Sequence, residues 1–362
     1  MTTLPHAYFN PPRRLPFVLP TPPEGKKLIS LAINESPYGC SRQAQAAAEA
    51  RFGDPNRYPD PSSADLRRAI GGQFALDPER LVCGNGSEEL LDVVARMFVR
   101  AGDQIVMSHS GFFQFAVVAA RLGAELLRAP ERDYITDIDA LLGLITTRTK
   151  LIFLAVPNNP TGVLLPVDEV IRLHQKLSPH VVLVLDLAYG EYIDKVDLDR
   201  LMRYGGSHPN IVVTRTFSKA YGLAALRVGW AVAPDWMTPG LNLIRGVGNI
   251  NAIAQAAAAA AVTDQVFVDR VVAETTAERA FMARHYSRLG LHFLPGFGNF
   301  LLTRFPDEES RSAARFIDFA MLEAGIWLRP VGEPGFANWS RIGLGNRVEN
   351  ELLIGLLEKF LK

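Results

Sequence analysis

The stretch Ile-Val-Val-Thr-Arg-Thr-Phe-Ser-Lys, residues 211–219, is a short apolar run that passes directly into hydroxyl side chains and a lysine. Comparable, nearly unbroken apolar runs occur at residues 80–83, 104–107, 150–156, 181–185 and 228–233. Runs that are apolar on both faces are typical of strands covered by helices on two sides. The segments between them have the length and periodicity of helices, at residues 87–101, 112–122, 137–146 and 167–177. The sequence therefore predicts an α/β fold with a mostly parallel sheet sandwiched by helices.

The 362 residues divide into three parts with different patterns, and the chain is long enough for two lobes. Residues 1–34 are rich in proline and predict an extended N-terminal arm, which needs a surface such as a second subunit to lie on. Residues 35–250 predict a large α/β domain. Residues 251–362 predict a small α+β domain joined by a long helix from 252 to about 289, with strands near 299–304, 326–329 and 340–344 and a final helix at 348–361.

Composition argues against several classes of partner and site. Lysine plus arginine equal aspartate plus glutamate at 38 each, so no net charge favours nucleic acid or an anionic membrane. Cys40 and Cys83 lie far apart in sequence, and the seven histidines lack ligand spacing, so no disulfide framework and no metal site is predicted. The first thirty residues lack the apolar stretch of a signal peptide, and no run is long enough to span a membrane, which predicts a cytoplasmic protein.

Polar residues follow several of the predicted strands, at the sheet edge where open α/β folds bind ligands. Asp186 ends the run 181–185, Pro-Asn-Asn-Pro-Thr-Gly follows the run 150–156, and Lys219 lies beyond the run 211–213. A buried carboxylate, lysine and hydroxyls are costly unless a ligand pairs with them. Pyridoxal phosphate (PLP) carries a pyridinium nitrogen, an aldehyde and a phosphate that would do so. The segment 84–88, Gly-Asn-Gly-Ser-Glu, follows a strand and opens a helix, so its amides can cradle the phosphate.

Each of these features also has an ordinary structural explanation. Asp186 could cap a turn, Ser218-Lys219 could lie on the surface, Ser87 could be a helix N-cap and Asn159-Pro160 could mark a turn. Their shared position at strand ends favours the cofactor site, because independent coincidences at one sheet edge are improbable.

The order and spacing of the motifs resemble those of fold-type I aminotransferases, most closely the histidinol-phosphate aminotransferase branch. The similar segments cover almost the whole chain: residues 32–37 (Ala-Ile-Asn-Glu-Ser-Pro), 57–60, 84–88, 157–162, 186–189, 216–222, 226–229 and 341–345. The block from Thr216 to Gly229 is the most specific of these. The resemblance implies the PLP transferase fold, with a sheet of the seven-stranded type and a smaller α+β domain.

The resemblance also implies roles around the cofactor. Lys219 would hold PLP as a Schiff base and then act as general base, Asp186 would keep the pyridine nitrogen protonated, and Tyr189 with Asn159 would bind the 3′ oxygen. The residues implied at the phosphate are Gly86, Ser87, Glu88, Thr216, Ser218 and Arg227, joined by Tyr58 of the neighbouring subunit in a homodimer. Phe112 would stack on the ring, where the branch often has tyrosine.

The substrate site implied by the resemblance consists of Arg341, Arg329, Asn34 and Phe17. Arg341 would bind the substrate carboxylate as a bidentate pair, although a structural salt bridge is the alternative. Arg329 lies where the branch has an arginine that contacts the substrate phosphate. Phe17 replaces a tyrosine whose hydroxyl reaches that phosphate in the branch, which favours an aromatic donor instead. Leu187, where the usual segment has Glu, is interpreted as a change of low consequence.

The predicted activity is transamination of histidinol phosphate with 2-oxoglutarate, in histidine biosynthesis. An aromatic amino-acid aminotransferase and, less favoured, a threonine-phosphate decarboxylase are the alternatives on the same scaffold. A dinucleotide-binding oxidoreductase is disfavoured, because Gly246-Val247-Gly248 lacks the third glycine and the preceding strand of the dinucleotide motif. A PLP-binding transcription regulator would need a DNA-binding module, for which these 362 residues leave no room.

Overall fold

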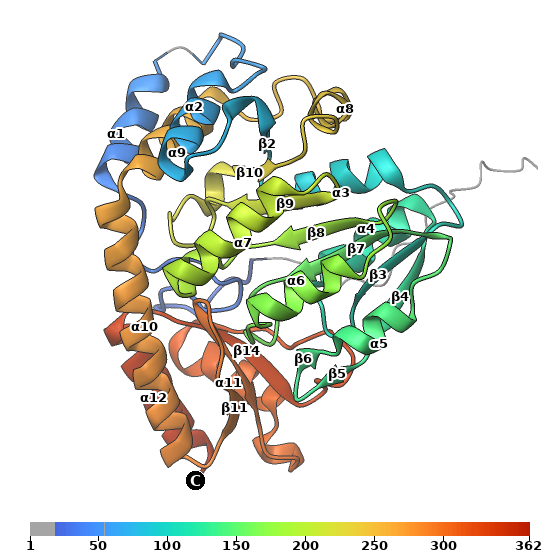
Figure 1. Cartoon of the computed structure of the whole chain (residues 1–362). Helices are drawn as coiled ribbons and strands as arrows, with labels where there is room; N and C mark the ends of the chain where they lie inside the picture. The colour runs from blue at the N-terminus through green and yellow to red at the C-terminus, as the bar shows by residue number, and fades with distance from the viewer. Residues whose placement is uncertain (1–18, 54) are drawn as a thin grey trace, which may run out of the picture.

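The computed structural model describes residues 19–53 and 55–362, and its centre is a seven-stranded sheet between two layers of helices (Figure 1). The strands lie in the order β2 (Leu81–Gly84), β10 (Gly229–Val232), β9 (Ile211–Thr216), β8 (Val182–Asp186), β7 (Thr149–Ala155), β3 (Gln104–Ser108) and β4 (Glu125–Ala129). β10 is antiparallel to both of its neighbours, and the other pairs in the sheet are parallel. The predicted α/β fold with a mostly parallel sheet is confirmed.

Both faces of the sheet are buried, as the unbroken apolar runs predicted. In β8, Leu183 and Leu185 pack into one core while Val182 and Val184 pack into the other. Burying such a side chain fully contributes about 1.5–3 kcal/mol. The first core is covered by α1 (Arg42–Arg51), α2 (Ala64–Phe74), α5 (Ile138–Gly143), α6 (Val167–Gln175), α7 (Lys195–Ser207) and α9 (Ala252–Thr263). The second is covered by α3 (Ser87–Phe98), α4 (Phe113–Leu122) and α8 (Thr238–Ile244).

A smaller lobe with its own apolar core lies beside the carboxyl ends of the parallel strands (Figure 1). It contains an antiparallel sheet of β11 (His292–Leu294), β12 (Phe300–Arg304) and β14 (Trp339–Gly343), with α10 (Gln265–Arg288), α11 (Ala313–Ala324) and α12 (Arg347–Phe360). Within the predicted N-terminal arm, β1 (Ile29–Ser30) pairs in parallel with β13 (Ile326–Trp327) of this lobe. The division of the chain into an arm and two domains stays a prediction.

The predicted helical stretch from 252 to about 289 consists of two helices, which meet at Asp264. Asp264 has a non-helical backbone, with φ −88° and ψ 66°, and it ends α9. Its side chain accepts a hydrogen bond from the backbone N–H of Phe267 and so caps the start of α10. A capping aspartate inside an otherwise helical pattern is the signal that was overlooked.

Two features at the far edge of the sheet were not predicted. β4 is an edge strand in which only Ala129 is fully buried, so it lacks a long apolar run. The next segment forms a short hairpin of β5 (Glu131–Arg132) and β6 (Ile135–Thr136).

Throughout the described part of the chain, no helix combines the length and the apolar character that crossing a membrane requires.

Candidate active site

Lys219 lies three residues beyond β9, and its amine is buried between the sheet and the segment 31–35. Its Nζ donates hydrogen bonds to the carbonyl oxygens of Ile33 at 3.2 Å and Asn34 at 3.1 Å. Burial lowers the pKa of the Lys219 amine to about 7, and the charge of Arg341 acts in the same direction. A large fraction of this amine is therefore neutral near pH 7, as a nucleophile or a general base requires.

Asp186 ends β8 and is almost completely buried, with 3% of its surface exposed. Thr214 of β9 lies opposite it in the sheet and donates a hydrogen bond from Oγ1 to the carboxylate at 3.1 Å. Burial raises the pKa of the Asp186 carboxyl to about 6, although this hydrogen bond opposes the shift. The charges of Lys219 and Glu88 also act on this carboxyl, which places both groups near it. A cationic ring nitrogen beside Asp186 would stabilise its ionised form.

Tyr189 and Asn159 lie in the same buried region. The Tyr189 hydroxyl accepts a hydrogen bond from Asn34 Nδ2 at 2.8 Å, and burial raises the pKa of this phenol. Asn159 Oδ1 accepts a hydrogen bond from Arg341 Nη1 at 2.7 Å. Both side chains can donate to a ring oxygen, so the geometry agrees with their predicted role at the 3′ oxygen.

The predicted phosphate site is a cradle between the start of α3 and the loop after β9. Gly86 immediately precedes α3 with φ 81°, and a Cβ there would come within 2.5 Å of Arg227 Nη2. Arg227 Nη1 donates to Ser218 Oγ at 3.3 Å, and Ser218 N donates to Thr216 Oγ1 at 3.1 Å. An arginine, several hydroxyls and the free amides of a helix N-terminus form a set of donors that fits a phosphate.

Two further residues of the predicted set belong to the first turn of α3. Ser87 is buried and Glu88 is half-buried. Ser87 would contribute an amide and a hydroxyl to the cradle, whereas the carboxylate of Glu88 would repel a phosphate. Glu88 therefore fits the cradle through its backbone N–H alone.

Arg341 is held at the centre of β14 and reaches the site from the smaller lobe. Its Nη2 donates to the carbonyl oxygen of Ala32 at 2.8 Å, and its buried Nε has no hydrogen-bond partner among the described residues. Arg329 lies close by, because its charge acts on both Arg341 and Tyr189. The Arg329 guanidinium carbon is 6.0 Å from the ring centre of Phe113, and Phe112 packs edge-on against Phe113 at 4.8 Å. The two predicted substrate arginines thus lie near each other, and Arg329 lies beside the aromatic wall formed by Phe112 and Phe113.

Asn34 lies beside Tyr189, to whose hydroxyl its Nδ2 donates at 2.8 Å, and its role at the substrate stays a prediction. It is buried and adopts a left-handed backbone with φ 57°, which asparagine tolerates better than most residues. Tyr58 is 97% exposed and so is not part of the pocket of its own chain. Phe17 lies outside the described residues.

Comparison with known proteins places this geometry in a family. A model of the family described as aminotransferase class I and II matches residues 26–357. The chain belongs to this aminotransferase family. The predictions of an aminotransferase and of PLP as its cofactor are confirmed by this membership and by the relatives.

Relatives of this aminotransferase carry a more specific name. The histidinol-phosphate aminotransferase of Nitrobacter hamburgensis is 38% identical over 342 residues, covering 94% of this chain and 93% of the relative. Histidinol-phosphate aminotransferase 2 of Ralstonia nicotianae is 39% identical over 338 residues, covering 93% and 90%. The crystal structure of the Sinorhizobium meliloti histidinol-phosphate aminotransferase with PLP has a TM-score of 0.89 at 30% identity and covers 96% of this chain and 95% of that one.

A fold-level likeness extends to a different chemistry. The structure of L-threonine-O-3-phosphate decarboxylase from Porphyromonas gingivalis has a TM-score of 0.78 at 21% identity, covering 92% of this chain and 99% of that one. At this identity the likeness shows the fold alone, so the aminotransferase fold does not select the reaction.

Three residues of the aminotransferase site were missed from the sequence. Thr214 supports Asp186, and Asn299 Nδ2 donates to the carbonyl oxygens of Asn34 at 3.0 Å and Glu35 at 3.2 Å. Asn158 Nδ2 donates to the carbonyl oxygen of Ser110 at 3.2 Å and so links the Asn159 loop to the Phe112 loop. Asn158 adjoins Asn159 and Thr214 lies two residues before Thr216, which was a usable signal, whereas Asn299 lies in another lobe and carried none.

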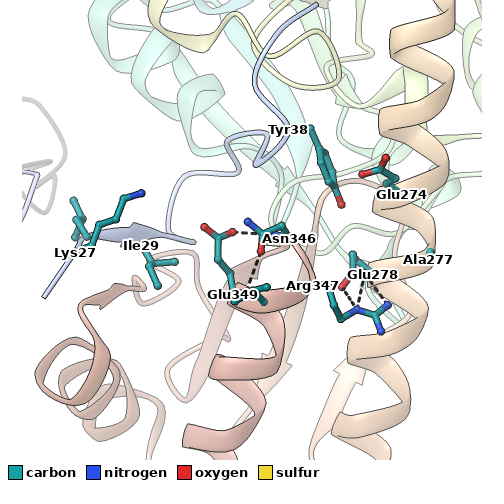
Figure 2. Close-up of a pocket in the computed structure, with 11 residues that line it drawn as sticks. Lys27, Ile29, Tyr38, Glu274, Ala277, Glu278, Asn346, Arg347 and Glu349 are labelled. Carbon is teal, nitrogen blue, oxygen red and sulfur yellow. Dashed lines mark hydrogen bonds and ion pairs between the residues drawn. The ribbon is translucent and has the colours of Figure 1, made fainter.

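A separate cavity of about 620 Å³ lies between β1, α10 and the start of α12 (Figure 2). Its polar groups are largely paired with each other. Glu278 binds Arg347 with a shortest distance of 2.7 Å, and Glu349 and Asn346 form a capping box. None of the residues gathered around Lys219 lines this cavity, so we do not assign the aminotransferase chemistry to it.

Proposed function

We propose that this aminotransferase uses histidinol phosphate as amino donor and 2-oxoglutarate as acceptor. The observation that supports this proposal is that two arginines lie near Tyr189: burial raises the pKa of Tyr189, and the charges of Arg341 and Arg329 both oppose that rise. Arg341, with its unpaired Nε, is suited to the carboxylate of the acceptor. Arg329 is then available for a second anion, which a phosphate on the donor would supply. The names of relatives at 38–39% identity agree with this assignment.

The residues around Lys219 would divide the work of transamination. Bound PLP supplies an electron sink that stabilises negative charge on the amino-bearing carbon of the donor. Asp186 would keep the ring nitrogen protonated, while Tyr189 and Asn159 would donate hydrogen bonds to the 3′ oxygen. The Lys219 amine would hold the cofactor and afterwards accept and return the proton at the donor carbon. Arg227 and the amides at the start of α3 would hold the cofactor phosphate in place.

We also propose a homodimer in which Tyr58 reaches the phosphate cradle of the partner. Tyr58, Leu243 and Val247 are 97%, 87% and 93% exposed. They lie on adjoining segments, because Arg245 Nη2 donates to the carbonyl oxygen of Pro61 at 2.6 Å. An exposed patch with large apolar side chains is typical of a surface that another protein covers. A cytoplasmic location remains part of this proposal.

The test is a single-turnover experiment with the purified, PLP-loaded enzyme. Histidinol phosphate, phenylalanine and threonine phosphate are each mixed with it, and loss of the cofactor absorbance is followed. We expect histidinol phosphate to react much faster than the other two. Faster reaction with phenylalanine would instead identify an aromatic aminotransferase, and release of carbon dioxide from threonine phosphate would identify a decarboxylase.

A further inference from the structure

The hairpin formed by β5 and β6 has an unusual residue at its tip. Its two-residue turn consists of Asp133 and Tyr134, which have φ values of 50° and 65°. Turns with two left-handed residues favour glycine, asparagine and aspartate, because a larger side chain is strained there. A bulky tyrosine at such a position persists only where its surroundings hold it. The contacts of Tyr134 are therefore informative.

Tyr134 packs into an aromatic cluster of the smaller lobe. Its ring centre is 5.9 Å from that of Phe336 and 5.6 Å from that of Trp339, and Phe336 and Trp339 are 5.6 Å apart. Val331 packs against the same cluster. Tyr134 thus contacts the loop of residues 330–338, which begins directly after Arg329.

This loop is anchored at Arg329 itself and at the two residues that follow it. Ser340 Oγ donates to the carbonyl oxygen of Arg329 at 3.3 Å, and Pro330 forms a β-bridge with Ser340. Two residues beyond Arg329, Val331 is held by the aromatic cluster that Tyr134 completes. Both anchors hold the backbone from which the Arg329 guanidinium reaches to 6.0 Å from the ring centre of Phe113.

The base of the same hairpin holds the turn of residues 108–111. The Glu131 carboxylate accepts hydrogen bonds from the Ser110 N–H at 3.0 Å, from Ser110 Oγ at 2.6 Å and from the Ser108 hydroxyl. Thr136 Oγ1 donates to Ser108 Oγ at 3.0 Å. This turn leads directly into Phe112 and Phe113. One hairpin therefore contacts the segment before the aromatic wall and the loop after Arg329.

We propose that the hairpin of residues 131–136 sets the spacing between Arg329 and the Phe112–Phe113 wall, with Tyr134 as the positioning residue for recognition of the donor phosphate. The inference rests on the proposed function, in which Arg329 binds that phosphate. It also accounts for the strained tyrosine, because the aromatic contact with the loop after Arg329 needs a large ring at the tip of the turn.

The experiment compares KM and kcat for histidinol phosphate and for histidinol, which lacks the phosphate. Tyr134→Gly removes the ring and relieves the backbone strain, so it separates positioning from folding of the turn. We expect its KM for histidinol phosphate to rise about tenfold, as for one misplaced charge-assisted hydrogen bond, with kcat and the KM for histidinol nearly unchanged. Tyr134→Phe keeps the ring and should behave like the wild type.

Two further variants complete the design. Phe336→Ala removes the partner of Tyr134 and leaves the hairpin itself intact, so it should reproduce the loss seen with Tyr134→Gly. Phe319→Ala removes a ring that is half-buried, as that of Tyr134 is, and that packs on Phe316 and Phe360 in the smaller lobe, away from the site. It should leave the KM for both donors unchanged.

The outcomes separate this inference from the proposed function. A wild-type enzyme with no preference for the phosphorylated donor would overturn the proposed function and this inference with it. A wild-type preference that Tyr134→Gly leaves unchanged would overturn the role of the hairpin alone. An equal rise in KM for both donors would also overturn it, because that result indicates a general loss of structure.

Discussion

Asp186 and Lys219 are two buried ionisable groups whose burial shifts each toward its neutral form. The pKa of the carboxyl is raised to about 6 and that of the amine is lowered to about 7. A cofactor that brings a ring cation to Asp186 and an aldehyde to Lys219 would satisfy both groups. Without such a ligand, burying Asp186 and Lys219 costs free energy, and this cost favours the prediction that PLP binds between them.

Asp186→Asn should have opposite effects on stability and on activity. In the cofactor-free protein the folded carboxyl keeps its proton up to about pH 6, whereas the unfolded chain releases it near pH 4. The stability that Asp186 contributes is therefore present below pH 4 and is lost as pH rises through about 6. Asparagine has no such loss, so above pH 6 we expect the free energy of unfolding to be larger than that of the wild type, by on the order of 1–3 kcal/mol.

The activity of Asp186→Asn should fall by about 100-fold or more, because the ring nitrogen loses its charged partner. Denaturant unfolding of the cofactor-free protein at pH 5 and pH 8, together with kcat of the loaded enzyme, measures both effects. Near-normal kcat would show that Asp186 does not act on the cofactor.

The sequence was informative about residues that end strands and much less so about those that support them. Lys219, Asp186, Asn159 and Arg227 follow apolar runs or lie in a specific motif, so local pattern was enough to select them. Asn299 acts by holding the backbone of Asn34 and Glu35 across a long sequence separation. Such a role exists only in the folded chain, and no local pattern indicates it.

At the scale of elements, the cofactor cradle depends on how closely β10 approaches the start of α3. β10 is antiparallel to β2 and pairs Gly229 with Gly84, just before the Gly86 turn. A Cβ at Gly229 would lie 2.5 Å from the backbone nitrogen of Ser87 and 2.8 Å from the carbonyl carbon of Gly86. These are backbone atoms, so the cradle itself would have to shift.

Gly229→Ala should therefore weaken PLP binding by about tenfold or more, since it displaces amides that would bind the phosphate. Titration of the cofactor-free enzyme with PLP, followed by absorbance, measures the Kd. Gly206→Ala is the matched control, because a Cβ there meets nothing within 4 Å. Equal affinities of the two variants would contradict the account of the cradle.

Most predicted elements of the sheet were found because burial on both faces gives an unmistakable apolar run. The strand β4 was missed because an edge strand needs little burial, and the break at Asp264 was missed because one polar residue hardly changes helical periodicity. The hairpin of residues 131–136 was missed for a related reason. Its turn carries tyrosine, whereas glycine or asparagine would have been the expected signal.

At the scale of the whole molecule, the segment 31–35 connects the sheet with the smaller lobe. Three of its carbonyl oxygens accept hydrogen bonds from distant parts of the chain. The oxygen of Leu31 accepts from Gly343 N at 2.7 Å, that of Ala32 from Arg341 Nη2 at 2.8 Å, and that of Ile33 from Lys219 Nζ at 3.2 Å. The site is thus assembled from three distant parts of the chain. The sequence pattern was enough to select Lys219 and Arg341, whereas their proximity in the folded chain depends on this segment, which binds both of them.

The central claim is that Lys219 holds the cofactor, and chemical trapping tests it most directly. The PLP-loaded enzyme is reduced with borohydride, digested with trypsin and mapped by mass spectrometry. We predict that the cofactor is fixed on the peptide of residues 216–227, because a modified Lys219 resists cleavage between Arg215 and Arg227. Attachment to any other lysine, or none after reduction, would contradict the account.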